Sequence, residues 1–157
     1  MGVEQCRIIQ LPKITDPRGN LSFIEAGRQI PFEIKRVYYL YDVPEGETRG
    51  GHAHKNLQQL IIAASGSFNV EVDDGTKRAT FFLNRPSRAL YLPIMIWREI
   101  TNFSSGAICI DLASDFYDPE DYYRDYQEFL AAAQSHAGVP PEHEYEPELA
   151  AFAVSHC

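Results

Sequence analysis

Short runs of β-branched and aromatic residues recur along most of the chain, with turn residues at intervals of about 8–12 positions. The run at residues 57–63 is nearly all apolar, and the run at residues 68–72 alternates apolar with polar side chains. Asp73-Asp-Gly75, between two such runs, is a strong hairpin signal. The runs are residues 6–12, 21–25, 34–42, 57–63, 68–72, 79–83, 90–93, 97–103 and 107–113. This series predicts an all-β fold, a sandwich or a barrel.

The pattern changes after Asp118-Pro-Glu-Asp. Pro119 near the start, acidic residues in the first turn and good helix formers later predict a short helix over residues 122–133. We therefore expect one domain over residues 1–134 and a C-terminal tail over residues 135–157, to which we assign no chemistry. At the other end, Pro12 closes the first run, which suits an edge strand or a strand exchanged between chains.

The most specific pattern lies between Gly46 and Gly66, where His52, His54 and Gln59 stand at fixed spacing. Successive side chains of a strand point to opposite faces, so the two histidines share one face and can converge on one ligand. The spacing resembles the first motif of the cupins, a family of jelly-roll barrels that normally has a glutamate at the position of Gln59. An amide is a poorer ligand for a transition metal than a carboxylate.

A second cupin-like motif follows at residues 93–102. Pro93 and Asn102 are kept, but Arg98 occupies the position of the third metal-binding histidine. A guanidinium group is a permanent cation without a lone pair, so it repels a metal ion and attracts carboxylate or phosphate. We expect a cupin jelly-roll barrel, followed by a short helical segment, that has kept its histidines and uses no metal or other cofactor.

The net charge of the chain and the positions of its basic residues limit the kinds of molecule that it is expected to bind. The chain has 157 residues and a formal net charge of −8, which suits one domain and disfavours nucleic acid and anionic membranes as partners. Basic residues nevertheless lie in or near the expected pocket strands, so a locally basic site for a small anionic molecule is expected. These residues are Arg18, Arg49, Lys55, Arg88 and Arg98.

The cysteines indicate no disulfide framework or zinc site. Cys6, Cys109 and Cys157 are far apart and odd in number. The first residues lack a basic stretch followed by an apolar run, and no segment approaches the length of a membrane span. The expected compartment is the cytoplasm.

Between about residues 16 and 130 the chain resembles the cupin-type sugar-nucleotide 3,4-ketoisomerases. The stretches that carry the resemblance are residues 31–39, 49–55, 90–93 and 112–124. The resemblance implies conversion of dTDP-4-dehydro-6-deoxy-D-glucose to a dTDP-3-dehydro-6-deoxyhexose without metal. It implies a place in the biosynthesis of dTDP-linked 3-amino or 3-acylamino deoxysugars of surface polysaccharides such as O-antigen. It also implies a homodimer with exchanged N-terminal strands.

The chemistry requires a base that takes the proton from C3, stabilisation of an enediolate, and return of a proton at C4. Neutral imidazole suits the base, and His52 matches the family motif. The resemblance makes Tyr38 the candidate to shuttle a proton between the sugar oxygens. His54 and Arg49 are candidates to orient His52 or to stabilise the enediolate. The candidates for binding the pyrophosphate or sugar are Arg18, Lys55, Arg98, Arg124 and, because alternation turns only one of two adjacent tyrosines inward, Tyr39.

Several of these candidate residues also have an interpretation in which they serve only the structure. The histidine pair could be ordinary strand residues or could hold a metal with water, and Tyr38 could serve core or interface packing. Arg98 could form a salt bridge with Glu99 or Asp111, and Arg124 one with Asp121 or Asp125. Asp16, Asn20 and Asn102 favour turns over catalysis.

Three rival functions remain at the level of sequence. The first is an epimerase of the same fold, which would leave the carbonyl at C4. The second is a non-catalytic cupin that binds a sugar nucleotide, and the third is a metal-dependent cupin enzyme. The fold is the same for all of these functions, so only the residues of the site can distinguish between them.

Overall fold

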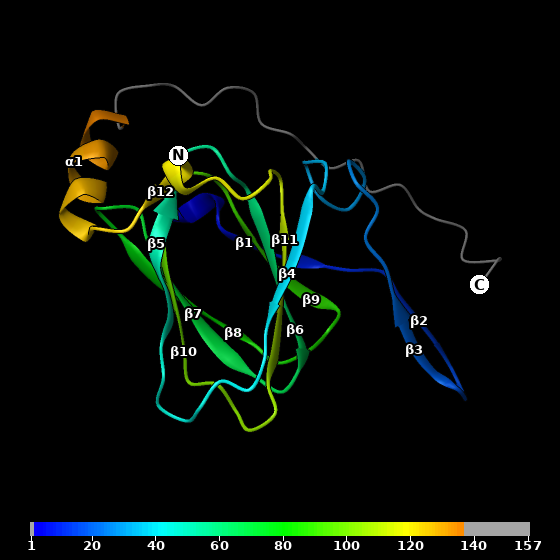
Figure 1. Cartoon of the computed structure of the whole chain (residues 1–157). Helices are drawn as coiled ribbons and strands as arrows, with labels where there is room; N and C mark the ends of the chain where they lie inside the picture. The colour runs from blue at the N-terminus through cyan, green and yellow to red at the C-terminus, as the bar shows by residue number, and fades with distance from the viewer. Residues whose placement is uncertain (1, 137–157) are drawn as a thin grey trace.

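A computed structural model describes residues 2–136 of the chain, so the expected tail lies almost wholly outside the described residues. The elements are strands joined by short turns, with one helix at the end (Figure 1). In chain order they are η1 (Val3–Gln5), β1 (Arg7–Gln10), β2 (Lys13–Asp16), β3 (Gly19–Ser22), β4 (Arg36–Leu40), β5 (Arg49–His54), β6 (Gln59–Ser65), β7 (Phe68–Asp73), β8 (Arg78–Leu83), β9 (Arg88–Leu92), β10 (Trp97–Thr101), β11 (Ile108–Ala113), η2 (Pro119–Asp121), β12 (Tyr122–Tyr123) and α1 (Tyr126–His136).

Two antiparallel sheets face each other and form the barrel. The first sheet has the order β1-β9-β6-β11-β4 and the second has the order β12-β5-β10-β7-β8. Neighbouring strands within each sheet are mostly distant in sequence, as in a jelly roll rather than a simple meander. The predicted all-β barrel with a short C-terminal helix is confirmed.

The interior of the barrel is apolar at one end and polar at the other. Alternation on β7 turns Phe68, Val70 and Val72 inward, where they meet Ile61 and Leu90 of the first sheet. These side chains belong to the largest buried apolar cluster. The polar end contains the two motif histidines and Arg98, so the apolar end supplies the packing that holds the strands of the polar end in place.

Each sheet is also covered on part of its outer face. Ile30 and Phe32, from the segment before β4, pack with Leu60, Ile62 and Tyr91 on the outside of the first sheet. This cover explains why β6 is apolar on both faces. On the second sheet, Phe129 of α1 is buried together with Ala53 and Met95.

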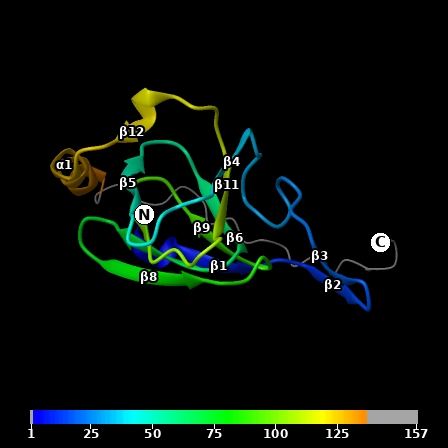
Figure 2. The same cartoon turned by 60° about the horizontal axis from the view of Figure 1, so that its bottom comes forward.

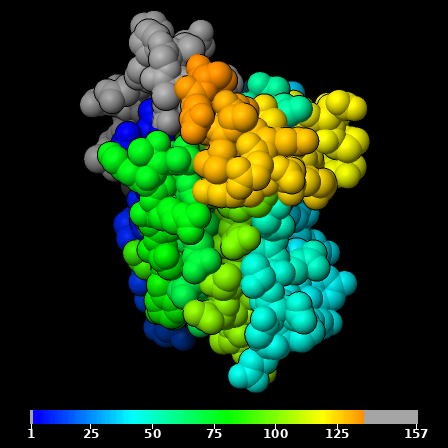
Figure 3. Space-filling model, turned by 90° about the vertical axis from the view of Figure 1, so that its left-hand side faces the viewer, coloured from blue at the N-terminus to red at the C-terminus, as the bar shows by residue number. Residues whose placement is uncertain are grey.

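The helix begins later than the sequence pattern indicates. Tyr122 and Tyr123 pair with β5 as strand β12, and α1 starts only at Tyr126. Asp125 supplies the start signal, because its carboxylate accepts a hydrogen bond from the Glu128 backbone N–H at 3.0 Å. The helical prediction for residues 122–125 is therefore wrong. Figure 3 shows α1 in orange at one end of this side of the molecule, beside the yellow segment that follows β11.

The hairpin of β2 and β3 extends away from the barrel, on the side opposite α1 (Figures 1 and 2). Its two strands pair only with each other among the described residues. The sequence pattern predicts no strand at β2 and places the next strand at residues 21–25, whereas β3 is Gly19–Ser22. The preceding β1 pairs with β9 at the edge of the first sheet, which agrees with the predicted edge strand.

No helix within residues 2–136 is long and apolar enough to cross a membrane.

Candidate active site

A cavity of about 520 Å³ lies at the polar end of the barrel, between the two sheets. Its walls come from β4, β5, β6, β10 and β11, and from the segment after β11. The residues that line it are Arg36, Tyr38, Leu40, Thr48, Arg49, Gly50, His52, Gln59, Ile61, Arg98, Ile100, Asp111, Tyr117, Tyr122 and Arg124.

His52 on β5 is the motif histidine that lines this cavity. Its ring hydrogen-bonds to the backbone of Gly50, while Nε2 is buried without a hydrogen-bond partner. The bond to Gly50 therefore involves Nδ1–H, which leaves the lone pair on Nε2. Burial, helped by the positive charge of Arg98, lowers the pKa of His52 to about 3. The imidazole is thus neutral near pH 7, the form that can accept a proton.

Gly50 is required at this point of β5 for two reasons. Its φ of 94° lies in the left-handed region, and an added Cβ would lie 2.9 Å from the Arg98 carbonyl oxygen of the neighbouring strand. The pairing of β5 with β10 shifts register between Arg98 and Glu99, next to this close approach. The glycine therefore lets the two strands meet where His52 is held.

His54 lies beside His52 and does not line the cavity. Its side chain is fully buried, and its ring stands edge-on to that of His52 with centroids 4.8 Å apart. Burial lowers the pKa of His54 far below its ordinary value, so the ring is neutral and its Nδ1–H donates to Asp121 Oδ2 at 2.8 Å. This hydrogen bond fixes the orientation of the His54 ring, and the fixed His54 ring packs against the His52 ring.

Tyr38 on β4 is the centre of a chain of hydrogen bonds across the floor of the cavity. Its hydroxyl donates to Asp111 Oδ2 at 2.8 Å and accepts from Gln59 Nε2 at 2.6 Å. Gln59 Oε1 in turn accepts from Arg98 Nη1. Burial and the neighbouring Asp111 raise the pKa of Tyr38 well above its ordinary value, so the phenol keeps its proton.

Asp111 is a site residue that the sequence analysis treated only as a possible salt-bridge partner. Its carboxyl is buried in the cavity wall, and Oδ1 has no hydrogen-bond partner. Burial raises the pKa of Asp111 to about 7, although Tyr38 and the charges of Arg98 and Arg36 act in the opposite direction. A carboxylate in the middle of an apolar strand, between Ile110 and Leu112, is the sequence signal that could have identified it.

Arg98 is buried, and its Nε donates to the Ile96 carbonyl at 3.0 Å. Its hydrogen bonds thus go to Ile96 and Gln59, and the salt bridge considered with Glu99 or Asp111 is not among the ion pairs of the described residues. The pKa of Arg98 is lowered by burial, while Nη2 remains without a partner in the cavity wall. An anionic group in the cavity would satisfy that donor.

The donor set does not fit a divalent cation. No group of three or more His, Cys, Asp or Glu side chains in the described residues could hold a metal ion. The Gln59 carbonyl is engaged by Arg98. Arg98 is paired with His52 across β10 and β5, and its positive charge helps to lower the pKa of His52. A cation between the histidines would face this positive charge.

The remaining cavity wall is cationic and aromatic. The Arg124 guanidinium lies 4.2 Å from the ring centroid of Tyr122, which itself packs against His52 at 5.0 Å. Arg36 lies over the ring of Tyr38 at 5.0 Å and over that of Tyr117 at 5.6 Å. Neither Arg36 nor Tyr117 was among the sequence candidates.

Three predicted binding residues lie outside the cavity. Tyr39 is 60% exposed on the outer face of β4, because alternation turns Tyr38 inward. The Lys55 ammonium group lies over the Tyr123 ring at 4.9 Å, and Arg18 is paired with Asp16 at the tip of the β2–β3 hairpin. Substrate binding by Tyr39, Lys55 and Arg18 therefore remains a prediction that the cavity of this chain does not support.

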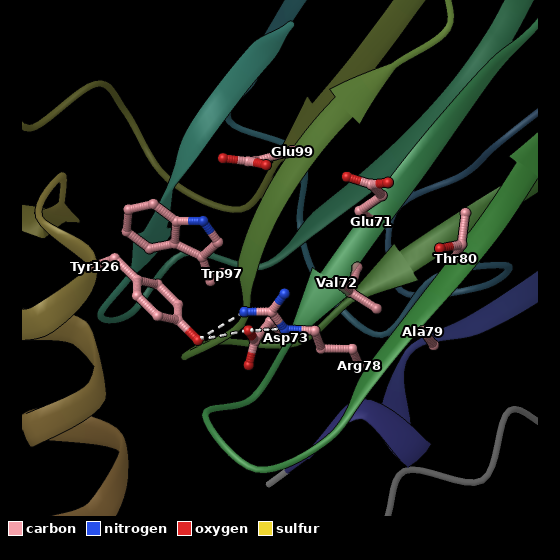
Figure 4. A pocket seen from close by; sticks show the side chains of 9 residues that line it. All are labelled: Glu71, Val72, Asp73, Arg78, Ala79, Thr80, Trp97, Glu99 and Tyr126. Carbon is pink, nitrogen blue, oxygen red and sulfur yellow. Dashed lines mark hydrogen bonds and ion pairs between the residues drawn. The ribbon is translucent and has the colours of Figure 1, made fainter.

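A second hollow, of about 340 Å³, lies on the outer face of the second sheet beside α1 (Figure 4). There the Asp73 carboxylate accepts hydrogen bonds from the Tyr126 hydroxyl at 2.7 Å and from Arg78 Nε at 2.8 Å. The Trp97 ring packs against Tyr126. None of the histidines within residues 2–136 lines this hollow, so we assign the chemistry to the cavity inside the barrel.

Comparison with known proteins places this geometry in a family. Residues 4–134 match the family described as FdtA: WxcM-like, C-terminal. The chain is 44% identical over 123 residues to a TDP-4-oxo-6-deoxy-alpha-D-glucose-3,4-oxoisomerase from Aneurinibacillus thermoaerophilus, which covers 78% of this chain and 88% of the relative.

Solved structures give the same result. The WlaRB TDP-quinovose 3,4-ketoisomerase from Campylobacter jejuni has 47% identity and a TM-score of 0.79, over 82% of this chain and 99% of that one. A mutant of the 3,4-ketoisomerase QdtA from Thermoanaerobacterium thermosaccharolyticum, in complex with TDP-4-keto-6-deoxyglucose, has 36% identity and a TM-score of 0.83. That match covers 85% of this chain and 96% of the other.

Proposed function

This chain belongs to the WxcM-like, C-terminal (FdtA) family, and on that premise we propose that it is a metal-independent sugar-nucleotide 3,4-ketoisomerase. The substrate is dTDP-4-dehydro-6-deoxy-D-glucose, and the product is a dTDP-3-dehydro-6-deoxyhexose. The relatives at 36–47% identity are all described as 3,4-ketoisomerases or oxoisomerases, which supports this reaction over epimerisation. The observation that carries the proposal is a half-buried, neutral His52 whose buried Nε2 has no hydrogen-bond partner, in a cavity rich in arginine.

His52 is proposed as the base that takes the proton from C3. The electron pair of the C3–H bond then forms a double bond between C3 and C4, and the C4 carbonyl oxygen becomes the enediolate oxygen. The low pKa of free His52 rises as this negative charge forms beside it, because an adjacent anion favours imidazolium. The same imidazolium can return its proton to C4.

Tyr38 is proposed to move the hydroxyl proton from O3 to O4. Its phenol keeps its proton and already donates and accepts hydrogen bonds within the cavity. A tyrosine that stays protonated can give a proton to one oxygen while it accepts one from another. His54 is proposed to hold His52 in place, since it contacts Asp121 on one side and His52 on the other.

The arginines of the cavity wall are proposed to bind the anionic parts of the substrate. The partnerless Arg98 Nη2 suits the enediolate, and Arg49 and Arg124 suit the diphosphate. Tyr122 and Tyr117 add aromatic surface next to these cations. The product would feed the biosynthesis of dTDP-linked 3-amino or 3-acylamino deoxysugars, including those of O-antigen.

We further propose a homodimer that exchanges N-terminal elements. An isolated two-stranded hairpin is at best marginally stable in water, yet β2 and β3 pair only with each other among the described residues. In the proposed dimer, the hairpin of one chain packs on a sheet of the other chain and brings Arg18 close to the cavity of that other chain. The cytoplasm is the proposed compartment, and Cys6 and Cys109, which form no disulfide within residues 2–136, are compatible with it.

Product identity tests the proposed function. Proton and carbon NMR of the purified protein with dTDP-4-dehydro-6-deoxyglucose should show the carbonyl carbon at C3 and a new proton at C4. A product that keeps its carbonyl at C4 but inverts a neighbouring centre would establish an epimerase instead. Saturable binding without any product would establish a binding protein.

A further inference from the structure

Asp111 lies in the cavity wall next to the groups proposed to move protons. Its Oδ2 accepts a hydrogen bond from the Tyr38 hydroxyl at 2.8 Å, and its Oδ1 is buried without a hydrogen-bond partner. Ionised carboxylates are almost never fully buried unless they are paired, and the described ion pairs include none for Asp111. Burial of an unpaired carboxylate lowers the stability of the fold, and such groups often have a function in catalysis or binding.

The direction of the hydrogen bonds points to that function. Arg98 can only donate, so the Gln59 carbonyl must accept from it and the Gln59 amide nitrogen must donate to Tyr38. The Tyr38 proton is thereby directed to Asp111. Three consecutive hydrogen bonds therefore have the same donor-to-acceptor direction, which leads from the Arg98 guanidinium group to the Asp111 carboxylate. The residues that form them lie on β10, β6, β4 and β11.

We infer that Asp111 is the proton acceptor of Tyr38, and that the Asp111–Tyr38 pair stores the hydroxyl proton of the substrate between its loss from O3 and its return to O4. This inference rests on the proposed function and extends it. Asp111 acts through Tyr38, and Gln59 with Arg98 fixes the direction of the relay.

The proton balance closes within the site. The O3–H bond breaks as its proton passes to the Tyr38 oxygen, while the Tyr38 proton passes to Asp111 Oδ2 and forms a carboxylic acid. In the return step, the Asp111 O–H bond breaks, Tyr38 regains that proton, and Tyr38 gives its own to O4. His52 separately carries the carbon-bound proton from C3 to C4. No oxidant, reductant or further reactant is needed.

The surroundings of Asp111 suit a group that changes charge during turnover. The titratable or charged residues that face it are Tyr38 and Arg36 on β4, Arg98 on β10 and Cys109 on its own strand, while β6 presents the uncharged Gln59. Burial raises the pKa of Asp111 to about 7, so neither protonation state is strongly preferred near neutral pH. Such a match between pKa and working pH is what general acid–base catalysis favours.

Asp111→Asn tests the inference, because it keeps the shape of the side chain and removes its ability to take a proton. We expect kcat to fall about 10²-fold or more while KM changes by less than about threefold, since a proton-transfer step is lost and binding is kept. In the wild type, kcat should fall as pH is lowered through about 7, and this dependence should be absent from Asp111→Asn. A kcat within twofold of wild type, or an unchanged pH profile, would overturn the inference.

The chain offers a matched control in Asp73. This carboxylate is also buried and also accepts a tyrosine hydroxyl, that of Tyr126 at 2.7 Å, but it lies in the hollow on the outer face of the second sheet (Figure 4). Asp73→Asn should leave kcat and its pH profile unchanged. If it lowers kcat as much as Asp111→Asn, the effect is one of packing and the inference fails.

Two further variants keep the test decisive. In a Tyr38→Phe background, Asp111→Asn should lower kcat no further, because Asp111 acts only through Tyr38. Should Asp111→Asn not fold, Gln59→Glu replaces the donor to Tyr38 with an acceptor, and full retention of kcat in this variant would overturn the inference. A wild type that forms no 3-keto product refutes the proposed function, whereas active wild type with unaffected variants refutes only the relay.

Discussion

At the scale of single residues, strand alternation and motif position predicted much of the site. His52 lines the cavity, and Arg49, Arg98 and Arg124 line it as well. Alternation requires that Tyr38 and Tyr39 point to opposite faces, but only the packing of β4 as the edge strand of the first sheet decides that Tyr38 is inside. Asp111 was missed because a strand carboxylate is more often solvated, and its burial depends on strands far away in the sequence.

The buried carboxyl of Asp111 should lower the stability of the folded protein. Its pKa is raised from 3.8 to about 7, so ionisation costs stability increasingly above pH 3.8, with the full cost above pH 7. Asp111→Asn removes this cost and should increase the free energy of unfolding by up to about 4 kcal/mol at pH 8, at ~1.4 kcal/mol per pKa unit.

Urea unfolding at pH 8 and at pH 4.5 measures this difference. The increase at pH 8 should be much larger than that at pH 4.5, where the wild-type carboxyl is largely protonated in the folded state. Equal stability of the two proteins at pH 8 would contradict a raised pKa at Asp111. A gain in stability together with a loss of activity is the expected signature of a functional residue.

At the scale of elements, most of the short strands followed from local pattern, whereas β2 and the start of α1 did not. Nine apolar runs correspond to strands, because β-branched and aromatic residues between turns specify strands with little help from the rest of the chain. Strand β2 was missed because Lys13–Asp16 has a single large apolar side chain, Ile14. The helix start was misplaced because Tyr122 and Tyr123 fit a helix equally well, and only pairing with β5 makes them a strand.

The β2–β3 hairpin should hold the proposed dimer together. Leu21 on β3 lies opposite Ile14 and is 47% exposed. Leu21→Asp should convert a dimer to a monomer, because a charge placed in an apolar contact must be desolvated. It should also raise KM, since Arg18 at the hairpin tip would no longer reach the other copy.

Sedimentation equilibrium measures the mass of each variant. Phe82→Asp is the matched control, since Phe82 is a comparably exposed apolar residue, at 53%, on β8 of the second sheet. A wild type that is monomeric at micromolar concentration, or a Leu21→Asp variant that stays dimeric, would refute the proposed role of the hairpin.

At the scale of the whole molecule, the sequence predicted a barrel but not the order of its strands. The cavity exists because β4, β6 and β11 of one sheet lie opposite β5 and β10 of the other. The strand pairings join residues far apart in the sequence, such as Tyr38 and Asp111, which are 73 positions apart. Local pattern carries no information on such pairings. Of the basic residues that the sequence places in or near the pocket strands of this acidic chain, Arg49 and Arg98 line the cavity.

We propose that His52 catalyses ketoisomerisation without metal. The most direct measurement is a proton NMR time course of the chelator-treated protein with dTDP-4-dehydro-6-deoxyglucose in deuterated water, beside His52→Asn. The wild type should form a 3-keto sugar that carries deuterium at C4, and His52→Asn should form it at least about 10²-fold more slowly while still binding TDP. Isomerisation that stops on chelation would show that the enzyme needs a metal, and isomerisation that continues unchanged in His52→Asn would show that His52 is not the base.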